Sequence, residues 1–234
     1  MTFDVETAYR TIYSHFSERV RRDEPLSRHC TFGVGGPADI WVSVETSDDL
    51  LGLVTMCAER RWPLLIAGNG TNLLYADAGV RGIVARVAIS TYAIEDHGDG
   101  TALMVAGAGV SWPRLLNELA AQGWGGLEFG PGIPGTLGGG VISNAGAHDG
   151  NIGKVLAWVD VIDARQSEAQ PSVPLVRRYQ QDELELSYRH SRFRALRRMQ
   201  FDEQGFPVCA PRQLIEPAEI VSQVAVQLLS LIHI

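Results

Sequence analysis

Two glycine-rich loops constrain this chain more than any other feature of its sequence. The first is Gly68-Asn69-Gly70-Thr71-Asn72, and the second runs from Gly130 to Gly140. Glycine has no Cβ and tolerates positive φ, so such loops let bare backbone N–H groups approach a ligand closely. A nest of N–H groups suits an anion, above all a phosphate. Two such loops in one chain predict an extended ligand with a pyrophosphate, held between two layers.

An ordinary turn is the alternative for each loop. A simple turn needs one or two glycines, whereas Gly130–Gly140 holds six glycines and two prolines. The second loop therefore favours a ligand site. The first loop, taken alone, also fits a turn after a strand.

The residues around the first loop predict strand, helix, strand and then the loop. Alternating apolar residues predict a strand at 38–44, and capping and acidic residues at 46–49 open a helix. A short buried strand follows at 64–67. A Rossmann unit would place its glycine loop before a helix, but 73–87 has the pattern of extended chain. This excludes a classical dinucleotide fold.

The second segment begins with a predicted hairpin of strands 92–96 and 101–106, joined at Gly98-Asp99-Gly100. A helix follows Ser111 and closes at Gly123. Further strands are expected at 157–163 and 219–229, separated by a polar loop at 166–174 and a looser stretch at 196–218. Apolar residues at helical spacing from Tyr9 to Val20 predict a peripheral N-terminal helix.

Composition limits the partners of this chain. It has 234 residues, enough for a sizeable core, and a formal net charge of -7, which argues against non-specific nucleic-acid binding. Cys30, Cys57 and Cys209 form neither a disulfide framework nor a zinc site. We see no secretory signal and no run long enough to span a bilayer, and so expect a cytoplasmic protein.

Tyr188-Arg189-His190-Ser191 is the polar cluster best suited to chemistry. Arg189 carries a permanent charge and a planar donor fork that suits a carboxylate or phosphate. Other arginines lie nearby, so a solvated surface arginine is the alternative. His190 reads more simply as a hydrogen-bonded histidine than as a base. No Ser/His/Asp or metal-binding arrangement can be argued from the sequence.

Four motifs in this order resemble the UDP-N-acetylenolpyruvoylglucosamine reductase family, also called UDP-N-acetylmuramate dehydrogenases. They are Thr31–Ala38, Gly68–Asn72, Gly132–Gly139 with Asn144–Ala147, and Tyr188–Phe193. The resemblance covers roughly residues 20–195. It implies an α+β fold, a two-subdomain FAD-binding module of the vanillyl-alcohol-oxidase/p-cresol-methylhydroxylase type. The subdomains would be residues 25–88 and 89–228, after a peripheral helix within 1–24.

The resemblance also implies which residues bind the cofactor. They are the glycines, their loop neighbours and a later asparagine–glycine pair: Gly68, Asn69, Gly70, Thr71, Asn72, Gly132, Ile133, Pro134, Gly135, Thr136, Gly138, Gly139, Asn144 and Gly146. No metal is implied.

The activity implied by the resemblance is a bacterial step of peptidoglycan precursor synthesis. NADPH would reduce FAD, and hydride would pass to the enolpyruvyl group of a UDP-sugar to give UDP-N-acetylmuramate. Arg189 matches the family's active-site arginine, and a fixed cation beside the substrate carboxylate would stabilise the charge that develops there. Tyr188 and Ser191 match its substrate-site neighbours. We expect a monomer with no membrane or nucleic-acid partner.

The match to the family fails after Arg194. The family's third, substrate-binding domain carries a proton-donating serine and a late glutamate, and neither motif is found here, so we expect that domain to be missing. Residues 229–234 resemble a translated sequencing-adapter tail. Two alternatives therefore stay open: a non-catalytic FAD-binding fragment, or another flavin oxidase on the same module.

Overall fold

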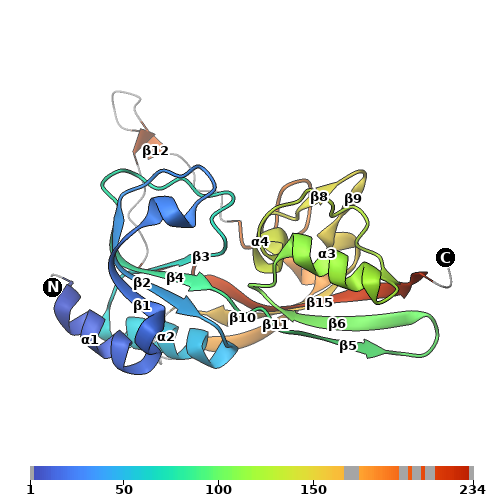
Figure 1. Ribbon diagram of the computed structural model, residues 1–234, viewed down its shortest axis with the longest axis horizontal. Coiled ribbons are helices and arrows are strands. Elements are labelled where there is room, and N and C mark those ends of the chain that lie inside the picture. The colour runs from blue at the N-terminus through green and yellow to red at the C-terminus, as the bar shows by residue number, and fades with distance from the viewer. Residues whose placement is uncertain (1–2, 166–173, 195–199, 202–206, 209–213, 232–234) are drawn as a thin grey trace.

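A mixed β-sheet and an antiparallel β-sheet, both flanked by helices, make up the computed structural model (Figure 1). The structure describes residues 3–165, 174–194, 200–201, 207–208 and 214–231. The expected polar loop at 166–174 and the looser stretch at 196–218 fall largely outside the described residues, as does Cys209.

The first sheet has the strand order β1-β2-β4-β3-β14. Its strands are β1 (Val20–Pro25), β2 (Pro37–Val44), β3 (Leu64–Ala67), β4 (Val80–Val87) and β14 (Ile215–Glu216). β1 is antiparallel to β2, whereas β2, β4, β3 and β14 run parallel. Helices α1 (Val5–Phe16) and α2 (Ser47–Arg60) lie on the same side of this sheet (Figure 1).

Alternation along β2 separates two cores. Ile40 and Val42 belong to the main core, with α1 and α2, whereas Trp41 belongs to a smaller cluster on the other face, together with Val84 and Tyr75. Successive side chains of a strand point to opposite faces, which explains this division. The smaller cluster lies beneath the 3₁₀ turn η2 (Leu26–His29), whose Leu26 is fully buried in it.

The expected helix after 46–49 is confirmed as α2. Thr46 is its N-cap, with Oγ1 accepting a hydrogen bond from the Asp49 N–H at 3.0 Å. The N-terminal helix is shorter than its apolar spacing suggests: α1 ends at Phe16. Val20 begins β1 instead, where it is buried opposite Val42. Pairing with β2 thus overrides the helical pattern.

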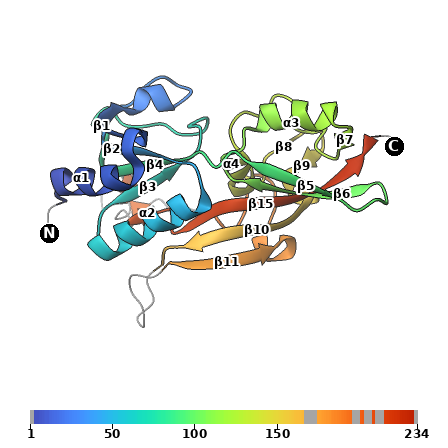
Figure 2. The ribbon, with the colours of Figure 1, turned by 60° about the horizontal axis from the view of Figure 1, so that its bottom comes forward.

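The second sheet has the order β11-β10-β15-β6-β5. Its strands are β5 (Tyr92–Asp96), β6 (Thr101–Gly107), β10 (Leu156–Asp163), β11 (Leu175–Gln180) and β15 (Glu219–Ser230), with β7 (Trp124–Gly125) paired to the end of β15. Figure 2 shows the long strand β15 lying between β10 and β6, and α3 (Trp112–Ala121) lying next to β7.

Short elements complete this part of the chain. They are α4 (Leu137–Ile142), the β8–β9 hairpin (Gly146–Ala147 and Gly150–Asn151), and the 3₁₀ turns η1 (Ser17–Arg19), η3 (Ile152–Lys154) and η4 (Gln181–Leu184). A separate two-stranded pair joins β12 (Gln200–Phe201) to β13 (Pro207–Val208).

The predicted hairpin and the predicted strand at 219–229 are confirmed as β5–β6 and β15. β15 continues to Ser230, which pairs with Trp124, so the strand includes the first two residues of the segment 229–234. β14 lies within 89–228 in the sequence, yet it pairs with β3 of the first sheet. The bounds of the two subdomains stay a prediction.

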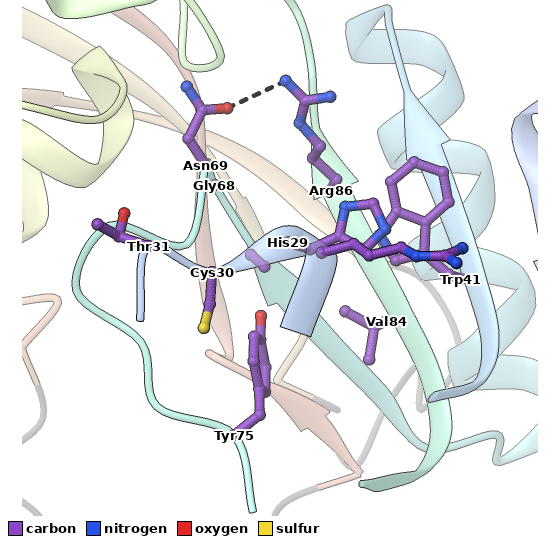
Figure 3. Close-up of a pocket in the computed structure, with 11 residues that line it drawn as sticks. His29, Cys30, Thr31, Trp41, Gly68, Asn69, Tyr75, Val84 and Arg86 are labelled. Carbon is purple, nitrogen blue, oxygen red and sulfur yellow. Dashed lines mark hydrogen bonds between the residues drawn. The ribbon is translucent and has the colours of Figure 1, made fainter. Parts of the chain in front are cut away.

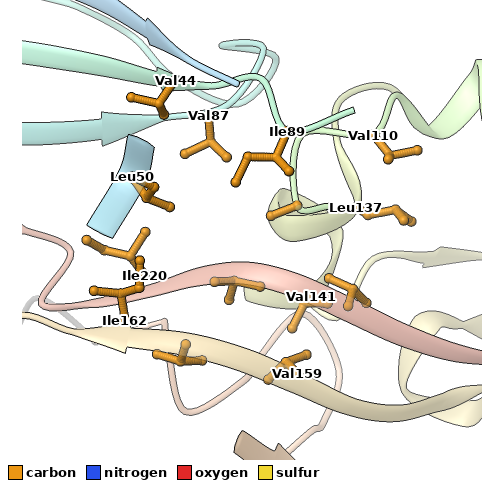
Figure 4. Close-up of a cluster of buried hydrophobic side chains, with 14 of the residues drawn as sticks. Val44, Leu50, Val87, Ile89, Val110, Leu137, Val141, Val159, Ile162 and Ile220 are labelled. Carbon is orange, nitrogen blue, oxygen red and sulfur yellow. The ribbon is translucent and has the colours of Figure 1, made fainter. Parts of the chain in front are cut away.

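One hydrophobic core joins the two sheets (Figure 4). Leu50 of α2 and Val87 of β4 come from the first sheet's side, and Ile162 and Ile220 come from the second sheet. All four are buried. Because interiors of this kind are close-packed, the loops that leave either sheet are held in a fixed relation to one another.

Candidate functional site

The two glycine loops lie side by side. The first follows the end of β3, and the second ends at Thr136, immediately before α4. A Cβ built on Gly68 would lie 3.1 Å from Thr136 Oγ1, and one built on Gly135 would lie 2.8 Å from Thr71 Oγ1. The structure thus brings together two segments that are distant in the sequence, and one ligand can contact both.

Several backbone N–H groups at this junction have no acceptor within the described part of the chain. Among the residues that the structure describes, this holds for the N–H groups of residues 69–72 and of Gly132, Gly135 and Thr136. Neighbouring groups are paired: the Gly138 N–H donates to the Ala108 carbonyl at 2.9 Å. A cluster of unpaired N–H groups is suited to binding an anion such as a phosphate.

The glycines of the site are of two kinds. Gly70, Gly138 and Gly146 are glycine because the chain packs closely there: a Cβ on any of them would overlap another part of the protein. Gly132 and Gly139 are different, because within the described chain a Cβ on Gly132 would meet nothing within 4 Å and one on Gly139 only Thr136 Oγ1, at 3.5 Å. Both are exposed. They leave room beside the loop junction.

Thr136 connects the loops to α4. Its side chain is buried, and Oγ1 accepts a hydrogen bond from the Gly139 N–H at 3.4 Å, which caps the helix. Leu137 and Val141 anchor the other side of α4 in the core. The first turn of α4 is therefore held against Gly68 of the first loop.

A cavity of about 340 Å³ lies beside the first loop (Figure 3). It is lined by Arg28, His29, Cys30, Thr31, Trp41, Ala67, Gly68, Asn69, Tyr75, Val84 and Arg86. Arg86 Nη2 donates to Asn69 Oδ1 at 3.1 Å, the contact dashed in Figure 3. Of these residues, the sequence predicts a ligand contact only for Gly68 and Asn69.

The wall of this cavity next to η2 is ordered by ring and charge contacts. The His29 ring stacks on the Trp41 ring with centroids 4.6 Å apart. Its Nε2 lies 2.9 Å from Oε1 of the buried Glu24. The motif that begins at Thr31 is the sequence signal that could have directed attention to this wall.

Arg189 lies on a tight turn. The His190 N–H donates to the Ser187 carbonyl at 3.1 Å, and the Ser187 N–H donates to the His190 carbonyl at 3.2 Å. Arg189 has a φ of 53°, and its side chain is exposed, as is that of Tyr188, which is 92% exposed. The turn presents both side chains outward.

Two buried side chains fix this turn against α4. Asn144 Nδ2 donates to the Ser187 carbonyl at 2.8 Å, while its Oδ1 accepts from the Gly153 N–H at 3.1 Å. Ser191 Oγ donates to the Ile142 carbonyl, at the end of α4, at 2.7 Å. The side chains of Asn144 and Ser191 thus form hydrogen bonds within the protein and hold the Arg189 turn in place. Their expected contacts with a cofactor or substrate stay a prediction.

Metal-binding clusters and membrane-spanning helices are both missing from the part of the chain that the structure describes. Its residues hold no group of three or more histidine, cysteine or acidic side chains that could bind a metal ion. Within the same residues, every helix is too short or too polar to cross a membrane.

A family model described as an FAD binding domain matches residues 38–167. The UDP-N-acetylenolpyruvoylglucosamine reductase of Heliobacterium modesticaldum is 41% identical over 173 residues, which are 73% of this chain and 51% of that protein. This chain spans about half the length of the curated relatives it matches.

Two solved structures have a similar fold. The crystal structure of UDP-N-acetylenolpyruvylglucosamine reductase (MurB) from Thermus caldophilus has a TM-score of 0.64 and 31% identity, over 91% of this chain and 63% of that one. An alkyldihydroxyacetonephosphate synthase, 14% identical with a TM-score of 0.60 over 98% of this chain and 41% of that one, shares the fold alone. The chain therefore belongs to the FAD binding domain family, with the two-subdomain α+β fold of the vanillyl-alcohol-oxidase/p-cresol-methylhydroxylase flavoproteins, and is similar to the UDP-N-acetylenolpyruvoylglucosamine reductases.

Proposed function

We propose that this chain forms the FAD-binding part of an enzyme that reduces UDP-N-acetylenolpyruvoylglucosamine to UDP-N-acetylmuramate with NADPH. The observation that carries the proposal is the meeting of the two glycine loops around backbone N–H groups that lack a protein acceptor among the described residues. The similarity to reductases of this name supports the substrate. NADPH as the co-substrate rests on the resemblance of the sequence motifs to that family.

The residues around the loop junction fit FAD. The N–H groups of residues 69–72 and of Gly132, Gly135 and Thr136 would hold its pyrophosphate, because N–H dipoles stabilise phosphate charge at close range. The open space beside Gly132 and Gly139 leaves room for the cofactor. When bound, FAD supplies the hydride chemistry that no side chain can provide.

Arg189 would bind the substrate carboxylate. Its guanidinium is permanently charged and forms a planar fork that matches a carboxylate. A cation held beside that group stabilises the negative charge that develops as hydride adds to the vinyl carbon. Asn144 and Ser191 hold the turn and keep the arginine in position, while Tyr188 is exposed next to it.

The proposal extends to the setting of the enzyme. The partner would be a small-molecule UDP-sugar, and the protein a cytoplasmic monomer in peptidoglycan precursor synthesis without nucleic-acid or membrane partners. The formal net charge of -7 agrees with a small-molecule ligand better than with a nucleic acid.

FAD titration of the purified chain tests the proposed cofactor site. Gly132→Ala and Gly98→Ala form a matched pair, because both glycines have positive φ (83° and 77°) and a Cβ added to either would meet no described atom within 4 Å. Both variants bear similar backbone strain, but Gly98 lies in the β5–β6 hairpin. We expect Gly132→Ala alone to weaken FAD binding. A folded wild-type chain that takes up no FAD contradicts the proposal.

Turnover assays test the proposed reaction. NADPH oxidation should depend on the enolpyruvyl UDP-sugar and should fall in Arg189→Ala but not in Arg178→Ala, since Arg178 pairs with Asp160 on the second sheet. Bound FAD without substrate-dependent NADPH oxidation would favour a non-catalytic FAD-binding chain. Oxygen consumption without the UDP-sugar would favour a different flavin oxidase.

A further inference from the structure

The Tyr75 hydroxyl is a buried polar group without a hydrogen-bond partner among the described residues. Tyr75 is 7% exposed, and its hydroxyl makes no hydrogen bond to any residue that the structure describes. Figure 3 shows its ring pointing from the loop after β3 into the cavity beside Gly68. Burying a hydroxyl without a partner is costly, so this atom points to a ligand in the cavity.

Arg86 brings an uncompensated charge to the same cavity. Its guanidinium donates to the Asn69 amide at 3.1 Å, and no carboxylate of the described residues lies within 4.0 Å of it. A guanidinium fork of this kind suits a phosphate.

Close packing holds Tyr75 in this position. A Cβ on Gly35, which has a φ of 126°, would lie 2.6 Å from Tyr75 Cβ, and the Gly36 N–H donates to the Ala76 carbonyl at 3.0 Å. The segment that contains Gly35 and Gly36 is thus bound to the segment that contains Tyr75 and Ala76. Burial, and secondarily the neighbouring Cys30, raises the pKa of Tyr75, so the phenol stays protonated and able to donate.

The cavity suits one part of a nucleotide. Its volume of about 340 Å³ is at the lower end for small-molecule sites, so it can take a portion of a dinucleotide and not the whole. Arg86 and Asn69 lie together on one side of the cavity, whereas Tyr75 and Thr31 line other parts of its wall (Figure 3). Charge for a phosphate and donors for hydroxyl oxygens therefore occur together.

We propose that this cavity binds a sugar phosphate or sugar-alcohol phosphate group, with Arg86 on the phosphate and Tyr75 on a hydroxyl or ring oxygen. The assignment of the source rests on the proposed function: the group belongs either to FAD or to the UDP-sugar, since both contain it. The two sources predict different effects of the same substitutions.

Tyr75→Phe is the main test, with Tyr13→Phe on the exposed face of α1 as the control. Without ligand, the Tyr75→Phe variant should be at least as stable in urea denaturation as the wild-type chain. If the hydroxyl had a purely structural role, the variant would be less stable than the wild-type chain. The affinity of Tyr75→Phe for a ligand that carries the sugar phosphate group should fall about 5- to 10-fold, as for the loss of one hydrogen bond. Arg86→Gln should weaken binding by about 10-fold or more and Arg86→Lys by less, with Arg10→Gln as the control.

Three probes identify the source of the group. Ribose 5-phosphate should bind the wild-type chain and lose affinity in both variants. If FAD supplies the group, its affinity falls in Tyr75→Phe while that of UDP-N-acetylglucosamine does not; the reverse holds if the UDP-sugar supplies it.

The outcome also separates this inference from the proposed function. If the Tyr75 and Arg86 variants bind all three probes as tightly as the wild-type chain does, the inference is overturned, even where the wild-type chain binds FAD. A chain that binds ribose 5-phosphate through Arg86 and Tyr75 but takes up no FAD overturns the proposed function and leaves the inference standing.

Discussion

A methyl group added at Gly139 tests whether the first turn of α4 borders the cofactor. Gly139 is exposed, and a Cβ there would lie 3.5 Å from Thr136 Oγ1, with no other described atom within 4 Å. The ligand-free fold therefore accepts alanine without a clash. Because glycine is a poor helix former, Gly139→Ala should raise the free energy of unfolding by about 0.5–1 kcal/mol.

FAD binding should change in the opposite direction. The new methyl group would occupy the space beside Thr136, where Gly68 of the first loop also approaches. Forcing a methyl group into a filled site costs about 1–3 kcal/mol, which corresponds to about 5- to 150-fold in affinity. Gly139→Ala should therefore be more stable than the wild type and bind FAD more weakly.

Gly140→Ala is the matched control. It adds the same group to the same helix, but Gly140 is buried, and its Cβ would lie 3.6 Å from the Trp112 ring and 3.8 Å from Ala145 Cβ, which are ordinary contacts. We expect a similar gain in urea denaturation and unchanged flavin fluorescence titration. Wild-type FAD affinity in Gly139→Ala, or equal weakening in both variants, would refute the reasoning.

Three further predictions concern stability. Leu50→Ala should lower the free energy of unfolding by about 2–5 kcal/mol in urea denaturation, because Leu50 is fully buried between the sheets, whereas Leu74→Ala, at a 72% exposed position, should change it by less than about 0.5 kcal/mol. Burial acts to raise the pKa of Asp163, but hydrogen bonds from Arg165 outweigh it and hold the pKa below its usual range. The ionised Asp163 carboxylate therefore stabilises the folded chain. This stabilisation is complete above the unfolded pKa of about 3.9 and is lost as the pH falls through the folded pKa. The loss of stability in Asp163→Asn should therefore be largest near neutral pH and should shrink in acid. Ser191→Ala should cost about 1–3 kcal/mol and speed amide exchange in residues 187–190 without changing FAD affinity; slower or unchanged exchange would contradict its placing role.

Local patterns predicted the elements that border the site. Thr46 and the acidic residues after it mark the start of α2 because they satisfy the helix's first N–H groups, and this depends on neighbours in sequence alone. Alternation identified β2, and the turn residues Gly98-Asp99-Gly100 identified the β5–β6 hairpin. The loops themselves were recognised by composition, since glycine is required wherever a backbone must approach another group closely.

Long-range contacts account for what the sequence did not reveal. α4 contains three glycines and only six residues, so its helix propensity is poor, and it forms because Thr136 caps it and Leu137 and Val141 pack into the core. The pairing of β14 with β3 and the cavity at Tyr75 likewise depend on segments far apart in the chain. No window of sequence contains these relationships.

The two parts of the candidate site are coupled through α4. At its first turn, Thr136 contacts the glycine loops, and at its last residue the Ile142 carbonyl accepts the Ser191 hydroxyl that holds the Arg189 turn. A helix of six residues is about 9 Å long, so this short element sets the spacing between the loop junction and the turn. The glycines of α4 permit close approach to the loop junction at one end, and buried hydrogen bonds fix the Arg189 turn at the other end. A shift of α4 would therefore move the loop junction and the turn together. The geometry that a flavin and a substrate carboxylate would share thus depends on the packing of Leu137 and Val141, which contact neither.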